Sequence, residues 1–137
     1  MPHPGVVLYY QDYEFSDGEK RDKFFVVLNS ADIGSPCLVL KTTSQSKRYE
    51  GVRQGCNPEK RVFFVPTEWK QCFERNTYVK LPEIFEIATL ELLKGALSKQ
   101  IRLMDPLSAD CFTKLKDCLK KFKTDISLQH WDLIFES

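Results

Sequence analysis

Short runs of apolar residues recur along the first hundred residues, and turn-forming residues separate them. The runs are rich in β-branched and aromatic side chains, a pattern typical of short buried strands. Pro82 follows one of them and indicates an edge or a bulge before residues 83–87. We therefore expect five or six short strands, at residues 5–10, 21–29, 38–45, 60–66, 76–81 and 100–104.

The apolar spacing changes from that of a strand to that of a helix after Ser108. Apolar residues then recur at intervals of three and four, which predicts an amphipathic helix over about 108–123 with Ser108 as its N-cap. An earlier helical turn or two is expected over 89–94, ending at Gly95 in a left-handed cap. The aromatic tail, residues 124–137, either docks on the fold or binds a partner.

These elements predict a mainly β fold with a C-terminal helix. A sheet needs its apolar face covered, and a strongly bent sheet that closes on itself with a helix across one end satisfies this need in a small chain. We expect a small β-barrel, over about residues 4–104, with the helix appended. At 137 residues the chain fits a single domain, 1–137, and can bury a substantial core without cross-links.

Two neighbouring strand ends carry candidate chemistry. Residues 21–29 begin with Arg21, Asp22 and Lys23, and residues 38–45 end with a run of hydroxyls. If the two strands pair as a hairpin through the turn at 30–36, the cations and the hydroxyls lie side by side. The sequence therefore predicts a site for a phosphate group at these ends.

The composition is that of an ordinary globular protein. With 42% hydrophobic and 28% charged residues it excludes the disordered and fibrous classes, and no stretch is long and apolar enough to span a membrane. The N-terminal residues lack the pattern of a signal peptide, so the cytoplasm is expected. The net charge is only +1, yet cations dominate the middle of the chain, where the loop at 44–59 is long enough to suggest a function.

The cysteines and histidines offer little further chemistry. Five cysteines, an odd number without a Cys-x-x-Cys pair, favour reduced thiols. Cys56 lies in a loop, where a cation would make it reactive, but an inert thiol is the simpler interpretation. Cys111 and Cys118 have the seven-residue spacing of a buried helix face rather than that of metal ligands. The two histidines lie near the ends of the chain, so we expect them to be surface residues.

Read in order, the segments resemble the PemK/MazF family of toxin endoribonucleases from bacterial toxin–antitoxin systems. The resemblance covers most of the chain. It implies an SH3-like β-barrel followed by the C-terminal helix at about 108–123. The residues that carry it are Pro4–Val7, Phe25–Asn29, Leu40–Gln45 and, as the best match, Phe73–Ile84.

The resemblance also implies an activity and partners. Such a protein is the toxin of a type II toxin–antitoxin system and cleaves single-stranded RNA without a metal or another cofactor, because the ribose 2′-hydroxyl attacks the adjacent phosphate. Its expected partners are single-stranded RNA, a cognate antitoxin and a second copy in a homodimer, with no membrane. The family has an Arg-Pro pair at the start of the second strand, where this chain has Lys20-Arg21-Asp22-Lys23.

By this resemblance the catalytic residues are Arg21, Lys23 and Thr43. Arg21 is the more natural phosphate ligand because a guanidinium offers forked donors, and Lys23 is the alternative because the pKa of a buried amine shifts. Thr43 would orient a phosphate oxygen, or else cap the strand end. The expected RNA-binding residues are Lys41, Thr42, Ser44, Lys47, Arg48 and Arg53, interleaved with Tyr49 as in grooves for single strands; a solvated loop is the alternative.

Two other functions stay open at this level. The missing Arg-Pro pair favours a catalytically silent barrel that binds RNA or a protein partner. A thiol-dependent enzyme centred on Cys56 is a more distant alternative.

Overall fold

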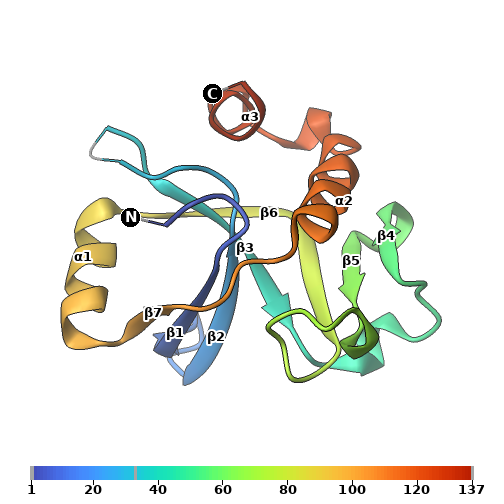
Figure 1. The fold of residues 1–137 in the computed structure, drawn as a ribbon, viewed down its shortest axis with the longest axis horizontal. Helices are drawn as coiled ribbons and strands as arrows, with labels where there is room; N and C mark the ends of the chain where they lie inside the picture. Colours follow the sequence, from blue (N-terminus) through green and yellow to red (C-terminus); the bar gives the residue numbers. More distant parts are fainter. Residues whose placement is uncertain (1, 33, 137) are drawn as a thin grey trace.

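The computed structural model describes residues 2–32 and 34–136, which form one antiparallel sheet with helices on both of its faces (Figure 1). The neighbour order of the strands is β4-β5-β6-β3-β2-β1-β7. The mainly β fold with a helix near the C-terminus is confirmed. The strands are β1 (Val7–Glu14), β2 (Lys20–Val27), β3 (Cys37–Thr43), β4 (Gly55–Asn57), β5 (Val62–Val65), β6 (Thr77–Ile87) and β7 (Ile101–Leu103), and the helices are α1 (Thr89–Ser98), α2 (Ala109–Lys120) and α3 (Leu128–Phe135).

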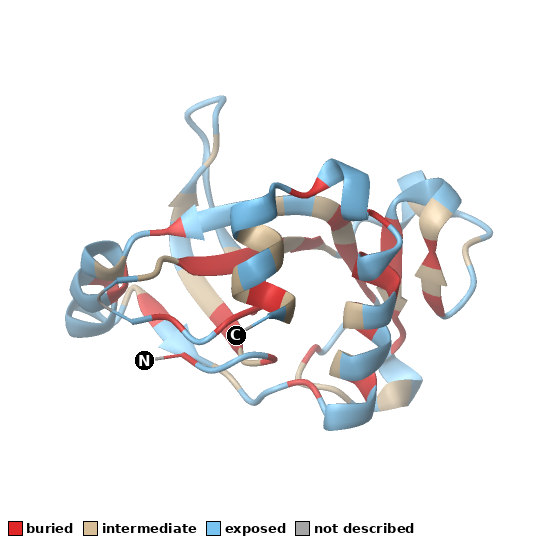
Figure 2. Cartoon of the chain, turned by 90° about the horizontal axis from the view of Figure 1, so that it is seen from above, coloured by how far each residue is buried: buried red, intermediate tan, exposed pale blue. Residues whose placement is uncertain are grey.

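Strand alternation divides the core into two clusters on opposite faces of the sheet. In β2, Val26 belongs to the cluster covered by α2 and α3, whereas Phe25 and Val27 belong to the cluster covered by α1. Figure 2 shows the buried residues on the strands and on the inner sides of the helices. Because successive side chains point to opposite faces, a sheet covered on both sides reads as the continuous apolar runs seen in the sequence.

The structure adds β4 and α3 to the elements predicted from the sequence. β4 has only three residues, too few for a period to be visible, and it lies within the loop predicted at 44–59. α3 forms from the predicted tail and begins after Ser127, whose side chain accepts a hydrogen bond from the His130 amide at 3.1 Å. Ile134 is only 5% exposed, so the tail docks on the core, the first of the two predicted alternatives.

α1 runs beyond the predicted end at Gly95. Gly95 lies inside the helix, and the left-handed cap falls instead at Lys99, whose N–H donates to the Ala96 carbonyl. The prediction of a cap at Gly95 was therefore wrong. The glycine has a different role, since a Cβ added there would lie 2.4 Å from Cδ1 of Ile101 on β7. It allows α1 to approach the sheet closely.

β6 continues through Pro82 rather than stopping before it. The β3–β6 pairing jumps from Leu40↔Ile84 to Thr42↔Val79, an irregularity that contains Pro82. A proline has no N–H for the ladder, so it fits where the ladder is interrupted. The prediction of an edge or a bulge before residues 83–87 is confirmed by this irregularity in the ladder.

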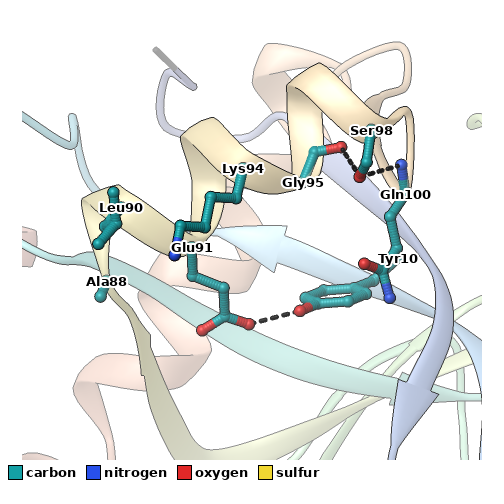
Figure 3. A pocket seen from close by; sticks show the side chains of 8 residues that line it. All are labelled: Tyr10, Ala88, Leu90, Glu91, Lys94, Gly95, Ser98 and Gln100. Atoms are coloured by element: carbon teal, nitrogen blue, oxygen red, sulfur yellow. Dashed lines mark hydrogen bonds between the residues drawn. The ribbon is translucent and has the colours of Figure 1, made fainter.

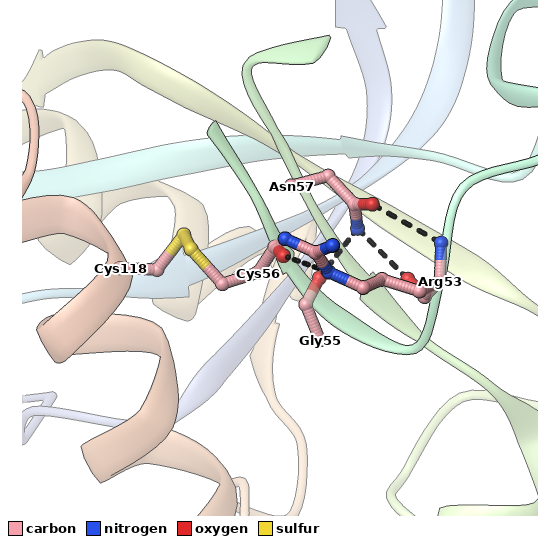
Figure 4. Close-up of a disulfide and its surroundings, with 5 residues drawn as sticks. All are labelled: Arg53, Gly55, Cys56, Asn57 and Cys118. Atoms are coloured by element: carbon pink, nitrogen blue, oxygen red, sulfur yellow. Dashed lines mark hydrogen bonds between the residues drawn. A yellow bond between two sulfur atoms is a disulfide. The ribbon is translucent and has the colours of Figure 1, made fainter. Parts of the chain in front are cut away.

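A disulfide joins Cys56 on β4 to Cys118 on α2 (Figure 4). The prediction that all five cysteines are free thiols was wrong for this pair. The two residues are 62 positions apart, so no local spacing in the sequence indicated their contact. Cys37, Cys72 and Cys111 are free, and burial raises the pKa of Cys37 to about 12.

Three positions of the predictions lie outside the described residues. They are Met1 and Ser137, at the bounds of the predicted domain and tail, and Ile33 in the predicted turn at 30–36. None of the helices in 2–32 and 34–136 is long and apolar enough to cross a membrane.

Candidate functional site

A pocket of about 570 Å³ opens at the ends of β2 and β3. The two strands pair as predicted, with Phe25 opposite Lys41 and Val27 opposite Val39. Lys23 and Thr43 lie just beyond this pairing, and both line the pocket. Six predicted site residues line the pocket: Arg21, Lys23, Thr42, Thr43, Ser44 and Arg48.

Cationic side chains outnumber carboxylates in the pocket wall. Arg75 and Lys80 join Arg21, Lys23 and Arg48, whereas the carboxylates among the described lining residues are those of Asp22 and Glu74. Aromatic rings of Phe15, Phe24 and Phe73 complete the wall. Positive charge with donors and apolar ring surface suits a phosphate ester attached to a base or sugar.

Lys23 lies at the centre of this positive charge. Burial, and after it the charges of Lys80, Lys41 and Arg21, lower the pKa of its ammonium from 10.5 to about 8. Like charges and partial desolvation both disfavour the protonated form. A bound phosphate would relieve this repulsion, so the cluster favours an anion.

Arg21 is held at the rim of the pocket. Its guanidinium carbon lies 4.3 Å from the centre of the Phe15 ring, and its Nε lies 3.9 Å from Oε2 of Glu19. The side chain keeps 52% of its surface exposed, so the ion pair is weak and the forked donors stay available to a ligand. Lys23 is the more enclosed of the two predicted phosphate ligands.

The two threonines differ in what their hydroxyls do. Thr42 is 3% exposed, and its Oγ1 donates a hydrogen bond of 2.9 Å to the Phe24 carbonyl, so its proton is committed to the backbone. Thr43 Oγ1 accepts a hydrogen bond of 3.2 Å from the Gln45 N–H, and its own proton can still be donated to a phosphate oxygen. Thr43 therefore caps the strand end and is also available to a ligand.

Asp22 occupies the place of the expected proline and has a structural role. Its carboxylate accepts hydrogen bonds from the Tyr9 hydroxyl and from the Asp12 N–H, the latter at 3.0 Å. The bond from Tyr9 is the main cause that lowers the pKa of Asp22. Asp12 has a left-handed φ of 54° and lies where the β1–β2 register shifts. The chain thus uses Asp22 to hold an irregular first hairpin.

Three of the predicted RNA-binding residues do not line the pocket. Lys41 places its Nζ 4.0 Å from the centre of the Phe85 ring, although its charge still acts on Lys23. Arg53 donates from Nε to the Cys56 carbonyl at 3.2 Å and braces the disulfide loop, as Figure 4 shows. Lys47 is exposed on the short 3-10 helix η1 (Ser46–Tyr49).

Arg75 and Lys80 were missed by reasoning from the sequence. Lys80 lies on β6, which pairs with β3 and places Tyr78 opposite Thr43, and Arg75 lies two residues before β6 begins. The sequence did contain one signal for Lys80. Every second residue of a β-strand faces the same side, so Lys80 faces the same side of β6 as Tyr78. Choosing β6 as the neighbour of β3 required knowledge of long-range pairing.

A second pocket, of about 540 Å³, lies between β1 and α1 (Figure 3). Its main polar contact is a hydrogen bond of 2.5 Å from the Tyr10 hydroxyl to Oε2 of Glu91. Burial, and after it Glu91, raise the pKa of Tyr10. The charged groups here are the Glu91 carboxylate and the nearby Lys94, so this pocket does not concentrate charge of one sign as the first pocket does.

Comparison with known proteins gives no assignment: no protein-family model matches the chain, and no curated protein matches it. The fold and the pocket define a mainly β protein with a cationic, ring-lined site. The function therefore follows from the chemistry of that site.

Proposed function

We propose that this protein is the toxin of a type II toxin–antitoxin system, a metal-independent endoribonuclease that cleaves single-stranded RNA. The observation that carries the proposal is the gathering of Arg21, Lys23 and Thr43 around one pocket, with Arg75 and Lys80 added from outside the predicted set. The resemblance to PemK/MazF toxins supplies the reaction class. The sheet would correspond to the family's SH3-like barrel, and the bending that this requires is supported by the irregular pairing in β1–β2 and β3–β6.

The proposed reaction moves one proton at each end of the scissile phosphate. The ribose 2′-oxygen loses a proton and attacks phosphorus, and the leaving 5′-oxygen gains one, which yields a 2′,3′-cyclic phosphate. A group with a pKa near 8 is suited to proton transfer near neutral pH, which favours Lys23 for this task. Arg21 would stabilise the charge on the phosphoryl oxygens, and Thr43 would donate to one of them.

The direct test is digestion of single-stranded RNA by the purified protein in EDTA. We expect cleavage by the wild type, with loss of about 100-fold or more in Arg21→Ala and Lys23→Ala. Lys20→Ala is a matched control on the same strand, because the exposed Lys20 does not line the pocket. Intact RNA across substrates of varied sequence would refute the nuclease.

A catalytically silent RNA-binding barrel is the second candidate. The observation in its favour is Asp22, which replaces the family's proline and directs its hydrogen bonds to Tyr9 and Asp12 rather than to a ligand. RNA affinity that falls steeply with salt, with no cleavage, would support this function. Turnover of RNA would reject it.

The partners also belong to the proposal. An antitoxin would occupy the cationic pocket, which suits an acidic segment as well as a phosphate. A homodimer could use the outer side of α1, where Leu90, Leu93 and Leu97 are exposed. The proposed toxin acts in the cytoplasm, where its RNA is found, and the Cys56–Cys118 disulfide would be one of the rare disulfides of that compartment.

A further inference from the structure

Three aromatic rings stack in a column across the sheet. Phe64 on β5 and Tyr78 on β6 have ring centres 4.7 Å apart and planes 8° apart. Tyr78 and Tyr49 have centres 5.0 Å apart and planes 20° apart. Both neighbours lie nearly parallel to Tyr78, and among the described residues neither Phe64 nor Tyr49 stacks on a further ring.

The column leads toward the cationic pocket. Tyr78 pairs with Phe64 on one side and with Thr43 on the other, so the rings run from β5 across β6 in the direction of β3. Thr43 and Arg48 line the pocket, and Arg48 also interacts with the Tyr49 hydroxyl. Tyr49, the last ring of the column, does not line the pocket itself but directly follows Arg48, which does.

Tyr78 and Tyr49 differ in how far they are buried, and this difference gives the two rings different roles. Tyr78 is 5% exposed and belongs to the framework. Tyr49 is half-buried, on a short helix with no buried residues, and keeps ring surface available to a ligand. An aromatic face beside cations is the arrangement on which bases of single strands stack while their phosphates are neutralised.

We propose that Tyr49 is the stacking platform for one nucleobase of a bound single-stranded RNA, whose adjacent phosphate lies among Lys23, Arg48 and Lys80. This inference rests on the proposed RNA binding, which it deepens by naming the residue that holds a base. A ring face accepts any base, so Tyr49 contributes affinity and positioning rather than a choice of sequence. The alternative is a stack that only fastens the helix η1 to the sheet.

The experiment uses the full chain with short 2′-O-methyl RNA, which lacks the attacking hydroxyl and stays intact. 2-Aminopurine is placed at each position in turn, and binding is followed by its fluorescence. We expect quenching at one position in the wild type and in Tyr49→Phe, which keeps the ring. In Tyr49→Leu, which keeps apolar cover over Tyr78, we expect no quenching and affinity lower by about 5- to 100-fold.

A second measurement needs no variant, so it holds even if Tyr49→Leu fails to fold. Oligonucleotides with one abasic position each are titrated against the wild-type protein. Loss of affinity at a single position, the one where 2-aminopurine is quenched, supports the platform. Equal affinity for all abasic strands, or unchanged quenching in a folded Tyr49→Leu, overturns the platform but leaves RNA binding intact. Absence of RNA binding by the wild type overturns the proposed function and this inference with it.

Discussion

The Tyr9 hydroxyl on β1 donates a hydrogen bond to the Asp22 carboxylate on β2 across the first hairpin. Asp22 also accepts from the Asp12 N–H, and Asp12 adopts a left-handed conformation that is costly for a residue with a side chain. The pair thus ties the strand that carries Arg21 and Lys23 to an irregular neighbour. The strength of these hydrogen bonds depends on the Asp22 carboxylate being ionised.

This dependence predicts how Asp22 contributes to stability at different pH. The hydrogen bonds lower the pKa of Asp22 below its ordinary 3.8, so the carboxylate stabilises the fold above that value. The contribution is lost as the pH falls through the lowered folded pKa. We expect Asp22→Asn to reduce the free energy of unfolding at pH 6, and this loss to shrink as the pH falls below 3.8 and through the lowered pKa of Asp22.

Urea denaturation at several pH values checks this prediction. Tyr9→Phe removes the other partner and should show the same trend, because it leaves the carboxylate without its main donor. An effect of Asp22→Asn that is constant with pH would contradict the assigned cause.

Gly95 gives a second prediction, because two known effects oppose each other there. Alanine is favoured over glycine inside a helix by about 1 kcal/mol. The new Cβ would, however, lie 2.4 Å from Ile101 Cδ1 and 2.5 Å from Ile101 Cγ1. We expect the clash to prevail, so that Gly95→Ala lowers the free energy of unfolding by about 1–3 kcal/mol.

The double variant Gly95→Ala/Ile101→Ala tests whether Ile101 is responsible. It should be less destabilised than the sum of the two single variants, because the clashing atoms are gone. Additive losses measured by urea denaturation would show that the space beside Gly95 does not limit the helix.

Gly95 also shows what the sequence could and could not predict. The buried strands were visible because both faces of the sheet are covered, and the β2–β3 hairpin followed from two adjacent runs. A glycine near a helix end favours a cap, but its real role depends on Ile101, whose position is set by tertiary packing. Prediction of the candidate site was limited in the same way, because some of its residues are brought there by tertiary packing. Its hairpin residues were predicted, whereas Arg75 and Lys80 required the β3–β6 pairing.

The disulfide gives a third prediction. Cys56 and Cys118 close a long loop, with a sequence separation of 62, which corresponds to about 4 kcal/mol of stabilisation in the chain-entropy account. We expect Cys118→Ser to reduce stability by roughly that amount, and Cys37→Ser, at a buried free thiol, to leave the disulfide in place. A thiol assay on the denatured, unreduced protein should find three free thiols; five would show that the bond does not form.

The outer side of α1 predicts an interface for the proposed homodimer. Leu90, Leu93 and Leu97 recur at helical spacing and are 61%, 50% and 86% exposed. The Glu91 carboxylate is held by the Tyr10 hydroxyl on the side of the sheet, so the exposed leucines would form the contact between two copies of α1. We expect Leu93→Glu/Leu97→Glu to convert a dimer into a monomer in analytical ultracentrifugation.

Leu128→Glu is the matched control for the α1 variant, because Leu128 is 75% exposed but lies on α3. It should leave the dimer intact. If the wild type is monomeric, or if only the α3 variant dissociates, α1 is not the interface.

Lys23 is expected to contribute to activity at the expense of stability. Burial and neighbouring cations lower its pKa from 10.5 to about 8 in the folded state, so between these values the unfolded chain binds the proton more tightly. Stability therefore falls as the pH decreases from about 10.5 to about 8, and the penalty stays fully present below that range. Lys23→Met, which removes the charge but keeps much of the side-chain volume, should raise the free energy of unfolding at pH 7.

The same variant should lose about 10²–10⁴-fold in RNA cleavage, since it cannot transfer a proton. Lys20→Met, at an exposed position of the same strand, should change neither quantity. A Lys23→Met variant that is both less stable and fully active would show that the lysine is neither strained by its neighbours nor part of the reaction.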